Sequence, residues 1–530
     1  MPRLLLLLVL GLLTPLFAHA ADSPEAERWW SHVQFLASDA LEGRDTGSEG
    51  HRKAAAYVAE QLAALGVKPG VGDAYLQDVE LTSRRVVEKR SSLALVRNGK
   101  EIPLVLGREA IISPRQGEPG TVEAALVFVG YGLSIPEAGH DDFADVDLQG
   151  KVAVILQGGP SRIPGALRAH HSSVAERTQA LRKAGAVGLV ILQSPKQQEM
   201  PWSRISESRH QPAMQFAEAS LNEEQGLKLR VSFNSEHAQK LFAGAPHSFQ
   251  EILALADKDQ PLPKFELPMR LKSRVDFAIA PVKSVNVVGL LPGSDPALAK
   301  EYMVLTAHLD HVGVGEPVKG DRIYNGAMDN AMGVAAVLEL ARALQSSKPK
   351  RSVIFALVTG EERGLLGSRY FAAHPTVSAE SLVANFNLDN FLPLTDFTRM
   401  VAYGREESSL AAPLQQIADA HGVTLVPDPD PNQMLFIRSD QYSFIRLGVP
   451  ALSFKFGYTR GSPEEALFKK WRYERYHAPS DDVAQPVNKE GAAKFIRVLA
   501  ELTRIVADAP ERPHWNGDSF FRRFARNGAP

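Results

Sequence analysis

Three short apolar segments, each predicted to be a β-strand, lead into a histidine or an acidic residue. The segments are 303–306, 352–358 and 383–388. The residues that follow are His308, Asp310 and His311 after the first, Glu361 and Glu362 after the second, and Asp389 after the third. Because ligands bind outside the carboxyl ends of strands in open α/β sheets, we expect these side chains to meet at one sheet edge.

Two further residues of this kind lie in predicted loops. Asp329 precedes an apolar helix predicted over 331–345, and His477 belongs to a late loop. Two imidazoles with several carboxylates suit zinc, and suit manganese or cobalt less well. Two metal ions about 3.5–4 Å apart need a carboxylate that bridges them. A lone histidine is more often structural, but this set as a whole indicates a metal centre.

Five motifs, in this order, carry a resemblance to a known family. They are Thr306-Ala307-His308-Leu309-Asp310-His311, Gly326-Ala327-Met328-Asp329-Asn330-Ala331, Gly360-Glu361-Glu362, Asn387-Leu388-Asp389 and Tyr476-His477. The chain resembles the di-zinc aminopeptidases, which include bacterial leucyl-type aminopeptidases and are related to glutamate carboxypeptidases and glutaminyl cyclases. The resemblance implies the zinc exopeptidase fold, an α/β fold in which helices sandwich a mixed central sheet.

The resemblance also implies a role for each matching residue. Two Zn²⁺ ions per chain would be held by His308, Asp329, Glu362, Asp389 and His477, with Asp329 bridging both ions. Glu361 would be the general base, and Tyr476 would place its hydroxyl near the oxyanion that forms on the substrate. Asp310 would orient His308, since it lies two residues on and points to the same side of an extended segment.

Several nearby residues fit other roles better. His311 is interpreted as a hydrogen-bonding neighbour of the centre, and Asp440 as mainly structural. His170 and His171 lie away from any carboxylate pattern and are predicted to occupy a solvated loop. Three positions, Met332, Asn390 and Gln441, differ from the residues common in the family, and none of them is a metal ligand.

The rhythm of strands and helices divides the chain into regions. We expect a signal peptide over 1–20, an N-terminal part of the catalytic domain over 21–120, an inserted domain over 121–268, the zinc peptidase domain over 269–510 and a loosely packed tail over 511–530. The insert resembles a smaller, β-rich protease-associated domain, on Gly130-Tyr131-Gly132, the Asp-rich stretch 141–147 and Gly150-Lys151-Val152-Ala153-Val154. By that resemblance it would carry no catalytic residue, and would cover the cleft, select substrates or bind a partner.

The N-terminus has the pattern of an export signal. Arg3 precedes a nearly continuous apolar run over 4–17, and Ala18-His19-Ala20 fits the small-x-small cleavage rule. The alternative, a membrane anchor, is disfavoured because the run is shorter than the roughly 20 residues that span a bilayer. We therefore expect an exported protein, in the periplasm or the medium, without stable membrane insertion.

Composition narrows the function further. The 530 residues are 44% hydrophobic and 23% charged, as in ordinary globular proteins, and the formal net charge is −2. This balance gives no broad attraction to nucleic acid. Cysteine is absent, so disulfides, cysteine-ligated metals and cysteine nucleophiles are excluded. The sequence predicts a zinc-dependent aminopeptidase acting on peptides with a free N-terminus. The alternatives are a dipeptidase, a carboxypeptidase or a glutaminyl cyclase on the same fold, and, less favoured, a non-catalytic binding protein.

Overall fold

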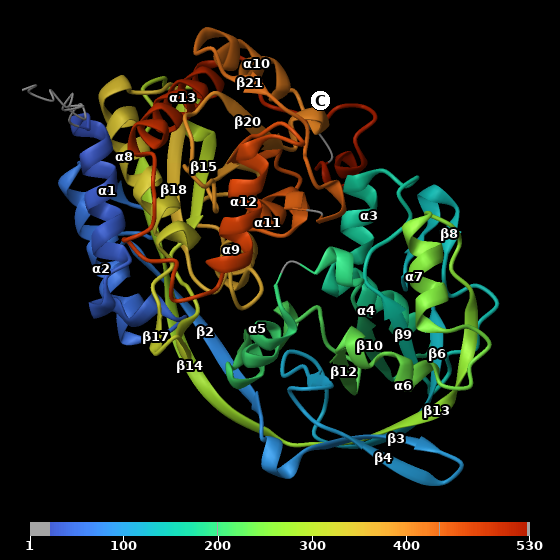
Figure 1. The fold of residues 1–530 in the computed structure, drawn as a ribbon. Helices are drawn as coiled ribbons and strands as arrows, with labels where there is room; N and C mark the ends of the chain where they lie inside the picture. The colour runs from blue at the N-terminus through green and yellow to red at the C-terminus, as the bar shows by residue number, and fades with distance from the viewer. Residues whose placement is uncertain (1–21, 199, 434, 527–530) are drawn as a thin grey trace, which may run out of the picture.

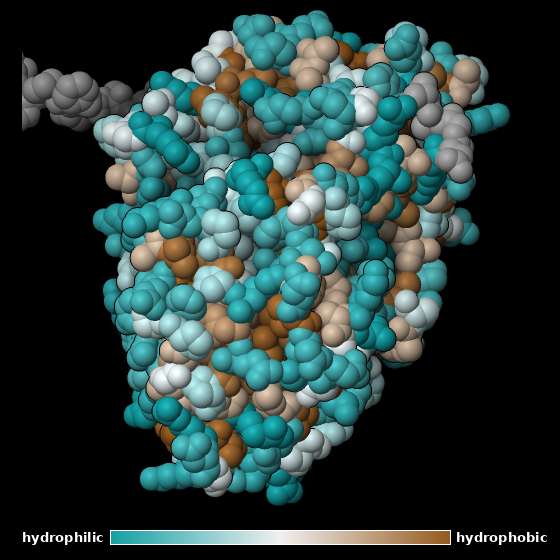
Figure 2. Space-filling model, turned by 90° about the vertical axis from the view of Figure 1, so that its right-hand side faces the viewer, coloured by the Kyte–Doolittle hydropathy of each residue, from teal (hydrophilic) through white to brown (hydrophobic). Residues whose placement is uncertain are grey.

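The computed structural model describes residues 22–198, 200–433 and 435–526, which form two mixed β-sheets with flanking helices (Figure 1). The predicted signal peptide lies outside the described residues. Among the described residues, no helix is both long and apolar enough to cross a bilayer. Hydrophilic residues cover most of the face in Figure 2, and hydrophobic residues show between them as separate areas.

The first sheet has the strand order β11-β2-β14-β18-β15-β19-β22-β20-β21, with β1 paired to β14. Its centre is parallel, because β15 pairs in parallel with β18 and β19, and β19 with β22. The strands are β1 (Lys68–Pro69), β2 (Leu76–Val86), β11 (Ala213–Phe216), β14 (Phe277–Leu291), β15 (Tyr302–His308), β18 (Ser352–Val358), β19 (Leu382–Asn387), β20 (Arg399–Tyr403), β21 (Thr424–Leu425) and β22 (Ala451–Phe456).

Helices cover both faces of this sheet. Alternate residues of β18 show the division, since Phe355 packs with α1, α2, α8 and α13, whereas Ile354 packs with α9 and α11. This alternation follows from the two-residue period of a strand. The helices are α1 (Pro24–Leu36), α2 (Glu49–Ala64), α8 (Met332–Ser347), α9 (Leu366–Ala373), α10 (Ala411–Ala420), α11 (Gln441–Arg446), α12 (Pro463–Glu474) and α13 (Lys489–Asp508).

The second sheet has the order β4-β3-β13-β6-β9-β10-β12-β5, with a parallel centre formed by β6, β9, β10 and β12. Its strands are β3 (Ser92–Arg97), β4 (Lys100–Leu104), β5 (Ala110–Ile112), β6 (Gly120–Val129), β9 (Val152–Leu156), β10 (Gly188–Leu192), β12 (Leu229–Phe233) and β13 (Lys264–Val275). The helices of this region are α3 (Gly165–Ser172), α4 (Val174–Lys183), α5 (Trp202–Glu207), α6 (Gln239–Phe242) and α7 (Phe249–Asp257).

The second sheet begins earlier in the chain than the expected insert. Strands β3, β4 and β5 lie before residue 121, yet β3 pairs with β13 and β5 pairs with β12. A single residue, Asp276, separates β13 from β14, and β14 pairs along its length with β2. The long strands β2 and β14 thus join the two sheets, as the curved ribbon at the bottom of Figure 1 shows.

Two expectations about exposed segments were wrong. His170 and His171 do not lie in a solvated loop, because they belong to α3 and His170 is only 4% exposed. The tail after Pro510 is not loosely packed over its described part, where Trp515 and Phe521 are buried and Phe521 contacts Phe436. In both cases aromatic side chains pack together in the interior, although polar residues flank them in the sequence.

Small connecting elements complete the fold. Two short antiparallel pairs stand apart from the large sheets, β7 (Ser134–Ile135) with β8 (His140–Asp141) and β16 (Gly313–Val318) with β17 (Asp321–Tyr324). The β16–β17 hairpin lies between the strand that carries His308 and the segment that carries Asp329. The chain between these two residues therefore leaves the sheet and returns to the same edge.

Candidate metal centre

The predicted ligands meet beyond the carboxyl ends of β15, β18 and β19. Nε2 of His308 lies 3.2 Å from an oxygen of Asp329 and 3.3 Å from an oxygen of Asp389. Nε2 of His477 lies 3.3 Å from the other oxygen of Asp329 and 3.1 Å from an oxygen of Glu362. The structure thus brings all five predicted ligands together, with Asp329 between two groups of side chains.

The spacing of these atoms fits metal coordination. Nitrogen and oxygen ligands at about 2.0–2.1 Å from a tetrahedral Zn²⁺ stand roughly 3.3 Å apart, close to the separations around Asp329. The ring nitrogen Nε2 of His477 is buried and has no hydrogen-bond partner among the described residues. An ion between Asp329 and Glu362 would satisfy this nitrogen, so the donor set fits a metal.

The electrostatics of the cluster also favour added positive charge. Burial lowers the pKa of His477, but the carboxylates of Glu362 and Asp329 outweigh it and raise that pKa to about 10. His308 behaves in the same way, since Asp329 and Asp389 raise its pKa well above the usual range despite burial. Carboxylates that hold imidazoles protonated in the absence of an ion form an environment in which a divalent cation is stabilised.

His311 makes a direct contact with one of the predicted ligands. Its Nδ1 is 2.8 Å from an oxygen of Glu362, and donor atoms of His311, Asp329 and Glu362 all lie within 4.8 Å of one another. Its ring also packs against that of His477 at 5.7 Å. His311 thus lies within reach of a metal ion as well as of Glu362, and the neighbour role expected from the sequence stays a prediction.

Asp310 occupies a different position from the one expected. The backbone carbonyl of Asp310, at 3.0 Å, lies near Nδ1 of His308, whereas the nearer carboxylate oxygen is 3.9 Å from that nitrogen. The carboxylate accepts hydrogen bonds from the backbone N–H groups of Glu361 and Glu362 at 3.1 and 3.4 Å, and from the hydroxyl of Thr46 at 3.1 Å. The extended strand ends at His308, so the side chain of Asp310 does not follow the direction expected from the sequence. Instead, the Asp310 carboxylate holds the Glu361–Glu362 turn in place.

Tyr476 stands beside the second group of ligands. Its ring stacks on the ring of His477, with centroids 4.0 Å apart. Burial, together with the negative charge of Asp329 and Glu362, raises the pKa of Tyr476 well above its usual value. The phenol therefore keeps its proton and remains a hydrogen-bond donor at neutral pH.

Glu361 is set apart from its neighbour by its surroundings. Burial, with the charges of Asp389, Glu362 and Asp440 nearby, raises the pKa of Glu361 well above the ordinary value, although His308 opposes the shift. The pKa of Glu362 moves the opposite way, because its contacts with His477 and His311 outweigh burial. Two adjacent carboxylates with separated pKa values suit an acid–base role for one and a ligand role for the other.

The support that two residues give to the centre was not predicted from the sequence. Asp481, interpreted from the sequence as a cap of local structure, accepts hydrogen bonds from the distant backbone N–H groups of Met328 at 2.9 Å and Asp329 at 3.1 Å. Buried Arg44 donates to the carbonyls of Leu309, Asn325 and Gly326. Burial lowers the pKa of Arg44 to about 10, and the charges of Asp481 and Asp310 oppose the shift.

Arg44 joins the segment of His308 to the segment of Asp329. The signal in the sequence was the polar, glycine-rich stretch 42–50 between two predicted helices. Glu42, Gly43 and Arg44 there have positive φ, which lets the chain turn the guanidinium inward. Its function depends on carbonyls some 265 and 281 residues further along the chain, which no local pattern reveals.

Comparison with known proteins places this centre in a family. Residues 286–503 match the profile of peptidase family M28. They are a peptidase family M28 domain. The matched range contains the metal-ligand set and Glu361, so the family and the zinc-exopeptidase fold class inferred from the motifs are confirmed.

Individual relatives agree with this family. A probable zinc metalloprotease of Pyrenophora teres f. teres (strain 0-1) is 37% identical over 111 residues, which are 21% of this chain and 23% of that protein. A second probable zinc metalloprotease of that fungus is 24% identical over 254 residues, 46% of this chain and 47% of that protein. The matches thus span less than half the length of these relatives.

A solved structure extends the fold comparison beyond the M28 domain. The aminopeptidase from Aneurinibacillus sp. strain AM-1 superimposes with a TM-score of 0.54 at 22% identity, over 92% of this chain and 95% of that one. At this identity the likeness concerns the fold. It includes the second sheet, because the aligned share of the chain is far larger than the M28 domain.

Proposed function

We propose that the chain is an exported zinc-dependent aminopeptidase that removes the N-terminal residue of peptides. The observation that carries the proposal is the shared carboxylate of Asp329, with His308 and Asp389 on one side and Glu362 and His477 on the other. The M28 family and the zinc metalloprotease relatives support zinc and a peptidase activity.

The donor set supports two ions per chain. Asp329 and Asp389 with His308 would hold one Zn²⁺, and Asp329 and Glu362 with His477 would hold the other. Zinc in such a site polarises the scissile carbonyl and lowers the pKa of a water molecule. Arg44 and Asp481 hold the two loops that bear the ligands, so the ligand positions are fixed before an ion arrives.

Glu361 is the proposed general base. Its raised pKa suits a carboxylate that accepts a proton from the attacking water and passes it to the leaving amine. The Asp310 carboxylate holds the backbone N–H of Glu361, which sets the direction in which the side chain leaves the turn. Tyr476, which keeps its proton, would donate to the substrate oxygen as negative charge develops on it.

An exopeptidase must also recognise the end of its substrate. The carboxylate of Asp389 is more exposed than that of Asp329, and its second oxygen can hold a protonated α-amine, which explains why we expect a free N-terminus to be required. The apolar run over 4–17 and the cleavage pattern that follows support export.

The second sheet is proposed to be a protease-associated domain that covers the centre. The contact that supports this role is Arg204 of α5, whose guanidinium donates to the carbonyls of Tyr473 and Tyr476, both at 3.0 Å. These carbonyls belong to the segment that leads directly into His477. The domain thus touches the backbone of the centre and contributes no ligand to the groups described above.

Hydrolysis of a panel of aminoacyl chromogenic substrates tests the proposal. Free and N-acetylated forms are compared, with chelator and with zinc added back. We expect cleavage of the free-amine set alone, lost with chelator and restored by zinc. Equal cleavage of acetylated substrates would contradict an aminopeptidase, and cleavage of none by zinc-replete protein would favour a dipeptidase, a carboxypeptidase or a cyclase.

A further inference from the structure

A cavity of about 640 Å³ lies between the carboxyl ends of strands from both sheets. Gln157 and Gln193, at the ends of β9 and β10, line one side. Phe391 and Leu392 line the other side, two and three residues after Asp389. A second link to the centre is the lining residue Arg472, whose guanidinium lies over the ring of Tyr476 at 5.1 Å.

The ionisable side chains that line this cavity are mostly basic. Among the described lining residues, six are basic and two are acidic. The basic residues are Lys196, Arg438, Lys455, Arg460, Lys469 and Arg472, and the acidic residues are Asp428 and Asp430. The chain as a whole carries 59 basic and 61 acidic residues, so this excess of positive charge is local.

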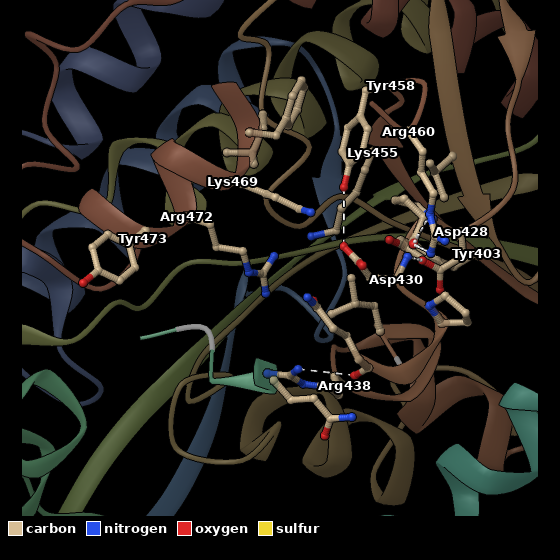
Figure 3. Close-up of a pocket in the computed structure, with 18 of the residues that line it drawn as sticks. Tyr403, Asp428, Asp430, Arg438, Lys455, Tyr458, Arg460, Lys469, Arg472 and Tyr473 are labelled. Atoms are coloured by element: carbon tan, nitrogen blue, oxygen red, sulfur yellow. Dashed lines mark hydrogen bonds between the residues drawn. The ribbon is translucent and has the colours of Figure 1, made fainter. Parts of the chain in front are cut away.

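Four of the basic side chains face the same space in Figure 3, namely Arg438, Lys455, Lys469 and Arg472. They come from separate parts of the M28 domain. Lys455 lies on β22, Lys469 and Arg472 lie on α12, and Arg438 follows a short helical turn. The other two basic residues have partners of their own, since Lys196 pairs with Asp257 and Arg460 donates to the carbonyl of Pro429.

Lys455 contacts the segment that follows the predicted ligand Asp389. Its Nζ donates to the carbonyl of Asn390, the residue after Asp389, at 3.3 Å. Within the part of the chain that the structure describes, Lys455 forms no ion pair, whereas Lys469 pairs with Glu465 at 2.7 Å. A half-buried ammonium with no carboxylate within ion-pair distance gains stability from an anionic ligand, although Asp389 acts on it from further away.

The two acids offset only part of this charge, since the lining holds six basic and two acidic residues. Asp428 accepts a hydrogen bond from the backbone N–H of Asp430 at 2.8 Å, and burial raises the pKa of Asp428. Asp430 lies 3.4 Å from the hydroxyl of Tyr458. Both acids are thus engaged at one end of the cavity, in the loop 428–431.

We propose that this cavity binds the side-chain carboxylate of the substrate's first residue, so that the peptidase prefers peptides that begin with Glu or Asp. The inference rests on the proposed aminopeptidase function and specifies its substrate class. Lysine and arginine both form charge-assisted hydrogen bonds with carboxylates, and arginine can form two at once. With the α-amine at Asp389, the side chain of the first residue is the part of the peptide that enters the adjoining cavity.

The first test compares charged substrates with neutral isosteres. Glutamyl, glutaminyl, aspartyl, asparaginyl, leucyl and alanyl p-nitroanilides are assayed with the zinc-replete full chain. We expect kcat/KM for the glutamyl substrate to exceed that for the glutaminyl one by about tenfold or more, mainly through KM. Glutaminyl or leucyl substrates cleaved as well as the glutamyl one would overturn the proposal.

Variants connect the preference to the cavity. In Lys455→Gln we expect the ratio of kcat/KM for the glutamyl substrate to that for the glutaminyl substrate to fall by about tenfold, and Lys455→Arg to restore it. Arg438→Gln is a second variant in case Lys455→Gln does not fold. Arg497→Gln is the control, because Arg497 forms an exposed ion pair with Glu25 outside the cavity. An unchanged preference in folded cavity variants would contradict the assignment.

Two further arms separate the sources of failure. Leucyl-alanine is compared with its C-terminal amide, because a preference that follows the free C-terminus would assign the cavity to that carboxylate and overturn the proposal. Binding of free L-glutamate and L-glutamine is measured by thermal shift, which needs no turnover. Failure of every aminoacyl substrate would refute the aminopeptidase function itself, whereas good cleavage without a preference for Glu would refute this inference alone.

Discussion

Each of the two sheets has a parallel centre, but different side chains follow the ends of their parallel strands. In the first sheet, β15, β18 and β19 lead to His308, Glu361 and Asp389. In the second sheet, β9, β10 and β12 lead to Gln157, Gln193 and Asn234. The first edge holds groups that bind metals and move protons, and the second holds neutral amides, two of which hydrogen-bond to each other at 2.9 Å.

This difference shows which part of the architecture carries chemistry. Both sheets direct strand ends toward the cavity of about 640 Å³, so the fold alone gives the same kind of edge twice. The residues placed on each edge decide its role, as expected where one fold hosts different functions. We infer that the first edge reacts with the substrate and that the second only shapes the space around it.

The largest loss of activity is expected when an acid at the edge of the first sheet is replaced by an amide like those at the edge of the second. Glu361→Gln replaces the proposed base with an amide, which cannot accept a proton. We expect kcat to fall by about a thousandfold or more while the bound zinc is unchanged, since Glu361 is not a proposed ligand. Steady-state assays and metal analysis measure both quantities. The matched change Gln193→Leu should alter kcat less than about threefold, and wild-type kcat in Glu361→Gln would exclude Glu361 as the base.

A smaller effect is expected from the support behind the first edge. Asp310→Asn replaces one of the two accepting oxygens with an NH2 group. The asparagine side chain can therefore no longer accept hydrogen bonds from both Glu361 and Glu362. We expect kcat/KM to fall by about 10- to 100-fold, as for other residues that position ligands. Circular dichroism checks that the variant folds. A folded variant with unchanged activity and unchanged zinc affinity would show that the Glu361–Glu362 turn does not need this support.

Loss of the hydrogen bonds from Arg204 to the segment before His477 should lower kcat/KM less than the Asp310 substitution does. Arg204→Met removes the donors to Tyr473 and Tyr476, which precede His477. Hydrogen bonds to charged groups contribute about 1.5–3 kcal/mol, so we expect kcat/KM to fall by roughly 10-fold. Arg209→Met is the control, because Arg209 lies in the next helical turn and pairs with Glu88. Equal effects of both variants would indicate a general loss of stability.

The smallest effect concerns pH and the packing of α3. His170 Nδ1 lies 2.6 Å from the hydroxyl of Tyr442 in α11, and burial lowers the pKa of His170 to about 4. The unfolded chain has a histidine pKa of about 6.5, so it binds the proton first as the pH falls. The stability from this site is therefore complete above pH 6.5 and is lost between pH 6.5 and 4.

Urea unfolding at pH 7.5 and pH 5 measures this contribution. We expect the wild type to lose about 1–2 kcal/mol more than His170→Gln between the two pH values, because glutamine retains a hydrogen-bonding group and does not titrate. Groups other than His170 contribute equally to both proteins and cancel. The same pH dependence in both proteins would mean that His170 does not hold α3 against α11.

The sequence predicted the elements whose patterns are local. Strand β18 matches its predicted range of 352–358, and α8 begins and ends within two residues of the predicted 331–345. Three of the five motifs lie where the parallel strands β15, β18 and β19 end, and the other two lie in loops, so the ligand set could be read from the order of the motifs along the chain. The range that matches the M28 family contains all five motifs.

Features that depend on distant contacts were not predicted. The second sheet recruits β3 and β5 by pairing with strands more than a hundred residues away, and β4 joins through its pairing with β3. The carboxylate of Asp310 was expected at His308, but the turn after β15 carries it to the amides of Glu361 and Glu362. Arg44 supports the centre through carbonyls in two remote loops, and the basic cavity forms only when β22 and α12 face the second sheet.

The stoichiometry of zinc tests the central claim most directly. Zinc is titrated into metal-free full-length protein by calorimetry, and bound metal is then measured by mass spectrometry. We predict two Zn²⁺ ions per wild-type chain, fewer than one in Asp329→Asn, and one in His477→Ala, where only the His308–Asp389 group remains complete. A single ion in the wild type, or two ions retained in Asp329→Asn, would contradict a centre built around a shared carboxylate.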